Sequence, residues 1–292
     1  MERIREERLH RTTGAKVLFG VIFAVLAVYA ASVLFTMVWC FYNSLKTTVE
    51  FHESYVALPK FWKFSNFGQA FKLINYNGTS FIGMFINSIW FAGGMTLLSV
   101  FMNCVTGYVF SKYKFFGREA AFGFILFTIA FPIVGALPSF YKIVLNLGMM
   151  DSPLFLLTAL GGFGGNFLIM YAFFKNISWS YAEAAQIDGA NDLYIFFRIM
   201  MPLAAGPVFA LTILGFVGQW NNYETPLLFL NSYTPLSSGL YRFWWIARYT
   251  IISSAETIYL AGVLLSVIPV IILVSIFGGK IMQNVSMGGL KG

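Results

Sequence analysis

The chain has 292 residues, of which 58% are hydrophobic and only 11% are charged. Because soluble domains carry about 25% charged residues, this composition excludes an ordinary soluble domain and fits a chain whose solvent is lipid. The formal net charge of +7 does not indicate a nucleic-acid partner, since the basic residues flank apolar spans instead of forming one patch. Cys40 and Cys104 lie in apolar spans, and only His10 and His52 are present, so neither a disulfide framework nor a metal site is expected.

Stretches without Asp, Glu, Lys or Arg mark the predicted membrane spans. Each is long enough for a helix of about 20 residues, which a bilayer core requires. The first follows an arginine-rich segment like the start of a signal peptide, but its apolar stretch is too long for one, so we expect an uncleaved helix. The prediction is an all-α integral membrane protein, one domain over residues 1–292, with six helices at about 17–45, 84–111, 120–141, 152–174, 203–228 and 257–280.

The distribution of basic residues predicts the orientation of these spans. Six helices place both termini on one side of the membrane, and more Lys and Arg lie on that side than on the other. The short segment from Lys112 to Arg118 adds a strong local signal, and such an excess marks the cytoplasmic face. We therefore expect cytoplasmic termini, a cytoplasmic loop at 175–201, and long external segments at 46–82 and 231–256.

The cytoplasmic loop is polar and sharply punctuated for so apolar a chain. Ser180 and Glu183 have the spacing of a capping box, which predicts a short helix that begins there. Gly189 would end that helix, because glycine readily takes the left-handed conformation found after helix ends. Asn191 or the next residue would cap a second helix, and Pro202 would open the fifth membrane helix near its first turn. From these residues alone, a cap with a stop and a contact site for another protein are equally open interpretations.

The same loop resembles the EAA loop of the membrane subunits of ABC importers. It carries Glu183-Ala184-Ala185, two intervening residues, Asp188-Gly189-Ala190 and a later Pro202. Further matches are Asn87-Ser88 at the start of helix two, Tyr108, Lys112-Tyr113-Lys114-Phe115 before Gly117-Arg118, Pro132 as a break in helix three, Gly239-Leu240, and Gly288-Gly289-Leu290-Lys291-Gly292. The chain is similar to permease subunits of the carbohydrate-uptake type, and among these to the second, six-helix permease of maltose transporters.

This resemblance implies a type I ABC importer transmembrane fold and a set of partners. A second permease subunit would complete the pathway, two cytoplasmic ATPase subunits would bind ATP and Mg²⁺, and an extracellular or periplasmic substrate-binding protein would deliver the sugar. The chain itself has no phosphate loop, since Gly278-Gly279-Lys280-Ile281 lacks the required glycine spacing and hydroxyl. We therefore expect a multi-pass subunit without enzymatic activity or cofactor, surrounded by lipid in the inner membrane of a bacterial or archaeal cell.

The resemblance also implies which residues meet the ATPase. In the family the loop glutamate contacts the ATPase, the glycine sets the turn, and the loop transmits ATPase closure to the helices. The C-terminal tail of the maltose-type subunit reaches between the ATPases, although Leu290 here replaces a smaller residue. The implied coupling residues are Glu183, Ala184, Ala185, Asp188, Gly189 and Ala190, and the implied tail contacts are Gly289, Leu290, Lys291 and Gly292.

Polar and aromatic residues at the end of helix five are candidates for the substrate path. Polar groups at membrane depth are costly and usually face a cavity, and amide groups beside aromatic faces suit a sugar. Many sugar permeases carry Trp-Asn-acid here, and this chain has Asn222 in place of the acid. In maltose transporters the partner permease holds most sugar contacts. The candidates are Trp220, Asn221, Asn222, Tyr223 and Glu224; the alternative is an aromatic belt at the outer interface.

The external segment at 231–256 is aromatic and basic. Pro235, Gly239 and several serines predict a loop rather than a helix over 225–241. In the family the matching loop reaches toward the substrate-binding protein. The alternative is an amphipathic segment that lies on the membrane surface. The candidates for contact with the binding protein are Tyr241, Arg242, Trp244, Trp245 and Arg248.

Two other functions are disfavoured by the spans. An intramembrane enzyme needs a nucleophile with a base, or metal ligands, and a secondary transporter normally shows paired ionisable groups and inverted repeats. The spans here are nearly free of charge. We expect a permease that forms half of the translocation pathway for a sugar, with an oligosaccharide favoured by family analogy. The alternative is a non-transporting structural membrane subunit of a complex.

Overall fold

The computed structural model describes residues 13–131, 135–161, 163–249 and 255–288. Most of these residues lie in helices. The described part of the chain contains one isolated β-bridge, between Tyr76 and Thr79, and no β-strand, so the all-α prediction is confirmed. The long helices are α1 (Thr13–Ser44), α4 (Phe81–Lys112), α11 (Ala205–Asn221) and α14 (Ala255–Gly288).

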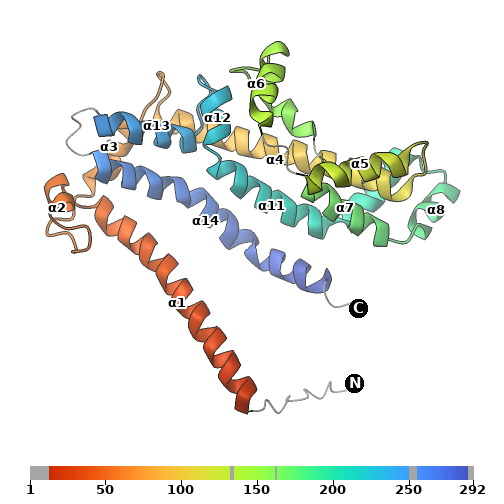
Figure 1. The fold of residues 1–292 in the computed structure, drawn as a ribbon, viewed down its shortest axis with the longest axis horizontal. Helices are drawn as coiled ribbons and strands as arrows, with labels where there is room; N and C mark the ends of the chain where they lie inside the picture. The colour runs from red at the N-terminus through yellow and green to blue at the C-terminus, as the bar shows by residue number, and fades with distance from the viewer. Residues whose placement is uncertain (1–12, 132–134, 162, 250–254, 289–292) are drawn as a thin grey trace.

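The molecule is elongated, and α4, α11 and α14 run along its long axis (Figure 1). One end carries α8 (Ser180–Ile187), and we call it the coupling-loop end. The other end, which we call the α13 end, carries α2 (Thr48–Glu53), α3 (Ser65–Leu73) and α13 (Leu236–Tyr249). Helix α1 meets the rest of the molecule at the α13 end and diverges from α14 toward its own N-terminal end, so most of its side chains are exposed (Figure 1).

Helix α4 is central and packs against both α7 (Gly165–Asn176) and α11. It approaches α7 closely at Gly107. A Cβ added there would lie 2.9 Å from the Cβ of Met170 and 2.9 Å from the backbone nitrogen of Tyr171. Because backbone cannot yield as a flexible side chain can, this glycine sets the distance between the two helices. Small residues have this role at many helix contacts in membranes.

Two clusters of buried side chains lie at the two ends of the molecule. At the coupling-loop end, Tyr108 of α4 and Met170 of α7 pack with residues from α8 and α11. At the α13 end, Ile74 and Met84 pack with residues of α13 and α14. Helix α13 buries one face in that second cluster, and the residues of this face are Leu236, Leu240, Phe243 and Ala247.

The predicted spans agree with the structure where helices are continuous. Helices α1, α4 and α14 are long and apolar enough to cross a membrane. The span predicted at 152–174 divides into the 3₁₀-helix η1 (Pro153–Gly161) and α7, and the span at 203–228 divides into α11 and α12 (Glu224–Phe229). Within the described ranges three helices qualify as spans, or five if each of two bent helix pairs is one span. The count of six stays a prediction.

The continuous helix predicted over 120–141 is wrong. Helices α5 (Arg118–Ala130) and α6 (Ala136–Asn146) are separate elements. Helix α5 has 13 residues, or about 20 Å of helix, and cannot cross a hydrocarbon core of about 30 Å alone. At Phe131 the backbone is extended, with φ −106° and ψ 102°, which ends α5. Pro132, the residue predicted to break this helix, lies outside the described residues.

The loop predicted over 225–241 is also wrong, because α12 and the start of α13 occupy much of it. Pro235 directly precedes the first residue of α13, a region where proline is tolerated. Gly239 lies inside α13 against α4, where an added Cβ would overlap the Sδ of Met84. The two residues therefore serve helix initiation and close packing rather than a turn.

We expect Gly107→Ala to lower the thermal unfolding midpoint of the purified protein by roughly 2–10 °C, since overpacking costs about 1–3 kcal/mol. The control is Gly93→Ala in the same helix, where an added Cβ meets no atom within 4 Å. That change should leave the midpoint unchanged or raise it, because alanine favours helix. Equal midpoints for the two variants, measured in one detergent, would contradict the packing role of Gly107.

Candidate functional site

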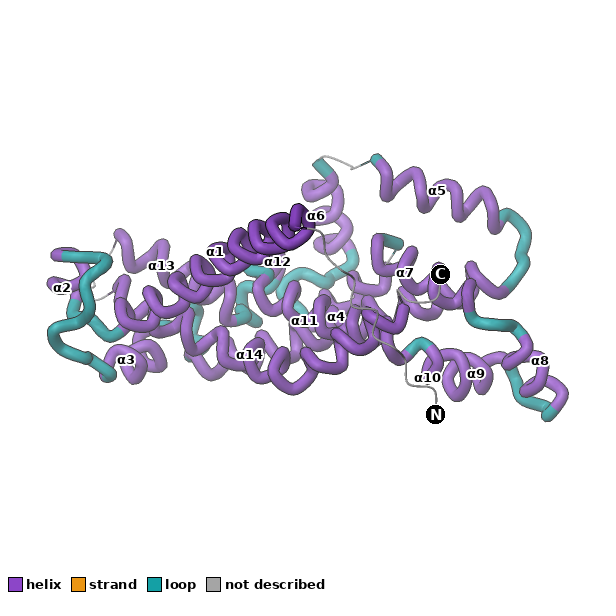
Figure 2. The backbone as a smooth tube through the Cα atoms, turned by 90° about the horizontal axis from the view of Figure 1, so that it is seen from below, coloured by secondary structure: helices purple, strands orange, loops and turns teal. Residues whose placement is uncertain are grey.

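The segment between α7 and α11 forms a short helix, a tight turn and a second helical run, as predicted. After α8, the run begins with α9 (Asp192–Ile195) and continues through the π-helical turn η2 (Phe196–Met200) into α10 (Met201–Leu203). It then bends by 76° at Ala204 into α11. Pro202 therefore lies before the bend and not in the first turn of α11, which corrects its predicted place. Figure 2 shows α8, α9 and α10 at the coupling-loop end.

Helix α8 begins one residue earlier than the predicted capping box requires. Its N-cap is Trp179, whose carbonyl oxygen accepts from the backbone N–H groups of Ala182 at 2.8 Å and Glu183 at 3.1 Å. Ser180 therefore lies inside the helix, and its hydroxyl oxygen is 2.7 Å from that of Ser178. The capping box is wrong. Glu183 is exposed, and its carboxylate does not take part in capping.

The turn after α8 is fixed by two backbone hydrogen bonds around Gly189. Gly189 has a φ of +85°, in the left-handed region, as predicted. Its N–H donates to the carbonyl of Gln186 at 3.0 Å, and the N–H of Ala190 donates to the carbonyl of Ala185 at 2.9 Å. These are the two bonds of a Schellman motif. The Asn191 side chain then accepts from a backbone N–H of α9 at 2.8 Å, which confirms the predicted cap.

Helix α8 has one buried and one exposed face. Ala182 and Ala185 are buried in the cluster at the coupling-loop end, and their small size lets α8 lie close to α4 and α7. Ile187, near the turn, is 87% exposed. The outer face therefore offers carboxylates and an apolar side chain to a partner. Of the predicted coupling residues, Ala185 is buried, Ala190 is half-buried, and the exposed ones are Glu183, Ala184, Asp188 and Gly189.

A row of aromatic rings joins the loop to α4. The rings of Trp179 and Tyr113 have centroids 6.0 Å apart, and those of Tyr113 and Tyr108 are 5.6 Å apart. Tyr108 then meets Phe196 of η2 at 5.1 Å. Burial raises the pKa of the Tyr113 hydroxyl. The Lys112 ammonium donates to a backbone carbonyl just before α8. Phe196, which is not among the predicted coupling residues, completes a continuous packed path from the loop to the central helix.

A hollow of about 560 Å³ opens in the elbow between α8 and the helical run that follows. Its lining includes the carboxylate residue Asp188, Tyr194 and the guanidinium residue Arg198. Groups of both charges there can pair with polar side chains of a partner. Sequence reasoning did not mark Tyr194, although its spacing of four residues from Arg198 places both on one helix face.

Another hollow, of about 280 Å³ and separate from the one beside α8, lies toward the α13 end, between α13, α14 and the end of α11. We call it the polar hollow. Three of the five predicted path residues line it, namely Trp220, Asn221 and Tyr223. Trp220 is itself buried, and its Nε1 donates to the carbonyl of Ser266 at 2.9 Å, which ties α11 to α14.

The other two path candidates, Asn222 and Glu224, do not line this hollow. The Asn222 side chain accepts from the backbone N–H of Thr225 and donates to its hydroxyl, both at 3.1 Å. The Asn222 carbonyl accepts from the Ser237 hydroxyl at 2.9 Å. Asn222 is therefore part of the corner between α11 and α12.

Arg242, a predicted binding-protein contact, is committed to contacts inside the chain. Its guanidinium carbon lies 4.3 Å from the ring centroid of Tyr76, and it donates to that tyrosine's hydroxyl. It also donates to the carbonyl of Leu227 at 3.0 Å and to Oδ1 of Asn231 at 2.7 Å. Arg242 therefore joins α13 to the segments before α4 and after α12.

The remaining α13 candidates differ in exposure. Trp245 is 43% exposed and Tyr241 is half-buried. The ring of Trp244 packs on Tyr259 of α14, with centroids 4.9 Å apart. The side chain of Arg248 lies outside the described residues. Among the predicted contacts whose side chains are described, Trp245 is therefore the most exposed.

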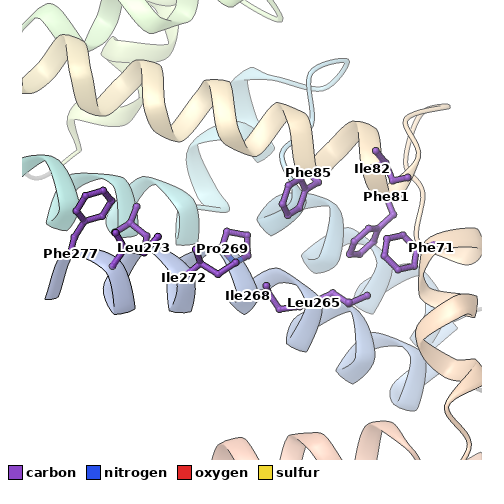
Figure 3. A pocket seen from close by; sticks show the side chains of 11 residues that line it. Phe71, Phe81, Ile82, Phe85, Leu265, Ile268, Pro269, Ile272, Leu273 and Phe277 are labelled. Atoms are coloured by element: carbon purple, nitrogen blue, oxygen red, sulfur yellow. The ribbon is translucent and has the colours of Figure 1, made fainter.

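An apolar hollow of about 580 Å³ lies between α3, α4 and α14 (Figure 3). Its lining consists of aliphatic and aromatic hydrocarbon side chains, among them Phe71, Phe85 and Leu273. Such a lining matches acyl chains or apolar side chains and gives no partner to sugar hydroxyls. The polar hollow, not this one, has the chemistry of a sugar path.

The coupling loop and the polar hollow lie within one matched region of the chain. The family model described as "binding-protein-dependent transport system inner membrane component" matches residues 97–286. The chain belongs to this family. It is a membrane permease whose relatives are transport proteins rather than enzymes.

Similar proteins carry the names of sugar transport systems. The diacetylchitobiose uptake system permease protein NgcG of Streptomyces coelicolor is 27% identical, over 92% of this chain and 87% of its own length. The polygalacturonan/rhamnogalacturonan transport system permease protein YtcP of Bacillus subtilis is 30% identical, over 68% and 72%. The trehalose transport system permease protein SugB of Mycobacterium tuberculosis is 28% identical, over 89% and 93%.

A solved structure supports the fold of this permease. It is a crystal structure of a bacterial ABC transporter involved in the import of the acidic polysaccharide alginate. One of its chains matches with a TM-score of 0.76 at 25% identity, over 92% of this chain and 98% of that chain. The predicted type I ABC importer transmembrane fold is therefore confirmed.

We expect Asn222→Ala to lower the thermal midpoint of the permease by roughly 2–6 °C, because its side chain bonds both the backbone and the hydroxyl of Thr225 and each lost hydrogen bond costs about 0.5–1.5 kcal/mol. Asn221→Ala, on an exposed side chain one residue earlier, is the matched control and should shift the midpoint by less. The two variants are compared with wild type in one detergent. A larger loss for Asn221→Ala would contradict the structural role of Asn222.

Proposed function

We propose that this permease is one of two membrane subunits of an ATP-driven sugar importer and forms half of its translocation pathway. A second permease subunit would form the other half. Two ATPase subunits with ATP and Mg²⁺ would drive transport, and an extracellular or periplasmic binding protein would deliver the sugar. The observation that carries the proposal is α8, which is packed on its inner face and exposed on its outer face at one end of the molecule.

The contacts of α8 explain how it would transmit motion. Its turn is held by the hydrogen bonds around Gly189, so the loop moves as one piece. The row from Trp179 through Tyr113 to Tyr108 packs it onto α4, and η2 continues through the bend into α11. Since packed interiors respond to displacement by rigid-body shifts, ATPase closure at α8 would move α4 and α11 together.

We infer that the coupling-loop end faces the cytoplasm of a bacterial or archaeal cell. The basic residues between Lys112 and Arg118 lie at the coupling-loop end of the molecule, as the positive-inside rule requires of a cytoplasmic face. Helix α1 runs toward the α13 end and α14 runs back, so both termini belong on the same side (Figure 1). The α13 end would then face the binding protein through Tyr241 and Trp245, without Arg242.

An oligosaccharide is the proposed substrate. The relatives above are named for diacetylchitobiose, polygalacturonan or rhamnogalacturonan, and trehalose. The polar hollow adds amide, hydroxyl and aromatic groups near the proposed external face. The tail residues, which lie outside the described ranges, are proposed to contact the ATPases: Gly289, Leu290, Lys291 and Gly292.

Assembly in native membranes tests the proposal. We expect the tagged chain, purified in mild detergent, to bring a second permease and an ATPase. The double variant Glu183→Lys, Gly189→Val should recover at least tenfold less ATPase than wild type. It should recover the second permease as before, because only the outer face and the turn of α8 change. The measurement is quantitative mass spectrometry of the purified complexes.

The matched control is Glu53→Lys with Gly78→Val at the α13 end, where Gly78 also has positive φ (+77°) and Glu53 is exposed. It should retain the ATPase. Equal ATPase recovery from both double variants would contradict the coupling role of α8. Recovery of the wild-type chain alone, where other membrane complexes survive, would overturn the importer proposal.

A further inference from the structure

The polar hollow is small and bounded by three helices. Its volume of about 280 Å³ is just below the roughly 300–1,000 Å³ typical of small-molecule pockets. It therefore suits one sugar ring rather than a whole oligosaccharide. Two hydrogen bonds hold its walls together: Trp220 to the Ser266 carbonyl joins α11 with α14, and Ser237 to the Asn222 carbonyl joins α13 with the α11 corner.

Asn221 gives this hollow hydrogen-bonding capacity for a ligand. Its side chain is exposed, and one of its amide N–H groups donates to the carbonyl of Val217 at 2.9 Å. No described residue pairs with its Oδ1 or takes its second N–H. An amide that donates and accepts side by side matches neighbouring hydroxyls on a sugar ring.

Tyrosines form the rest of the wall. The rings of Tyr223 and Tyr241 stack with centroids 4.7 Å apart and an interplanar angle of 22°, and Tyr259 adds a third ring from α14. The C–H face of a sugar ring can pack on an aromatic face, while its hydroxyls reach groups at the edge. A lining of aromatic surface with a few polar groups is typical of small-ligand sites.

The electrostatics of the hollow separate neutral from acidic sugars. Its lining side chains are aromatic, aliphatic, hydroxyl or amide groups, so an entering carboxylate would lose hydration without a countercharge. Glu224, the residue after Tyr223, does not line the hollow, and it would bring a negative charge rather than a countercharge.

We propose that the polar hollow is a sugar subsite of this permease that takes one uncharged sugar ring. The inference rests on the proposed function, because a sugar reaches the hollow only if the chain lines a sugar pathway. It assigns direct substrate contact to this subunit. It also assigns a preference for neutral over uronic sugars, unlike the systems whose names refer to polygalacturonan or alginate.

Thiol protection in the whole importer tests the subsite. Asn221→Cys is placed in a Cys40→Ala, Cys104→Ala background and labelled with N-ethylmaleimide in vesicles that contain the binding protein and ATP. The probes are maltotriose and diacetylchitobiose, which are neutral, and trigalacturonic acid, which is anionic. We expect the neutral sugar that the vesicles take up to slow labelling at least threefold, and trigalacturonic acid to have no effect.

Two further variants control this experiment. Asn75→Cys places a thiol at an exposed asparagine after α3, away from the hollow, and its labelling should not respond to any probe. Ser237→Cys, on the α13 wall of the hollow, repeats the measurement if the Asn221 variant does not assemble.

The outcomes separate this inference from the proposed function. Absence of labelling, or labelling that a transported neutral sugar does not slow, would overturn the subsite. Uptake of trigalacturonic acid alone, or protection by it equal to that of the neutral probes, would overturn the charge preference. Sugar-dependent ATP hydrolysis by the wild-type importer is measured on the same vesicles. Its absence would count against the proposed function instead.

Discussion

The close contact between α4 and α7 at Gly107 is the constraint on which the other elements depend. Apolar side chains gain nothing by leaving lipid for one another, so helices in a bilayer associate through shape and close packing. At Gly107 the two backbones meet without a side chain between them. Tyr108 and Met170 then pack beside this contact and create the buried surface for Ala182 and Ala185. The buried surface on which α8 lies therefore adjoins the close contact at Gly107.

The sequence was most informative where a requirement is local. A long run without charge can only be placed in lipid, and α1, α4 and α14 follow such runs. Gly189 and Asn191 were assigned correctly because a left-handed residue and a helix cap are decided by the residue itself and its nearest neighbours. The family pattern pointed to the same segment, and the structure shows which of its side chains face outward.

The sequence is least informative where a distant partner decides. Gly239 has the composition signal of a turn, but its reason is Met84 of α4, which no short-range rule reveals. Arg242 has the appearance of a surface contact, yet it bonds Tyr76, 166 residues away in the chain. Asn222 was grouped with its neighbour for the substrate path because sequence does not show that its amide is already used. Polar residues near a site divide into those that build it and those that face it, and only packing separates the two.

The two faces of α8 also bear on how such a subunit evolves. Ala182 and Ala185 have no room to vary, because they lie against the bundle. Glu183 and Ile187 are exposed, and the fold leaves their side chains free to vary, whereas Gly189 is held by its left-handed backbone. Under the proposed function, a lineage can therefore adapt to another ATPase by changes at Glu183 or Ile187 while the helices keep their places. Under the same proposal, two importers that arise by duplication can come to use different ATPases while every intermediate sequence still folds.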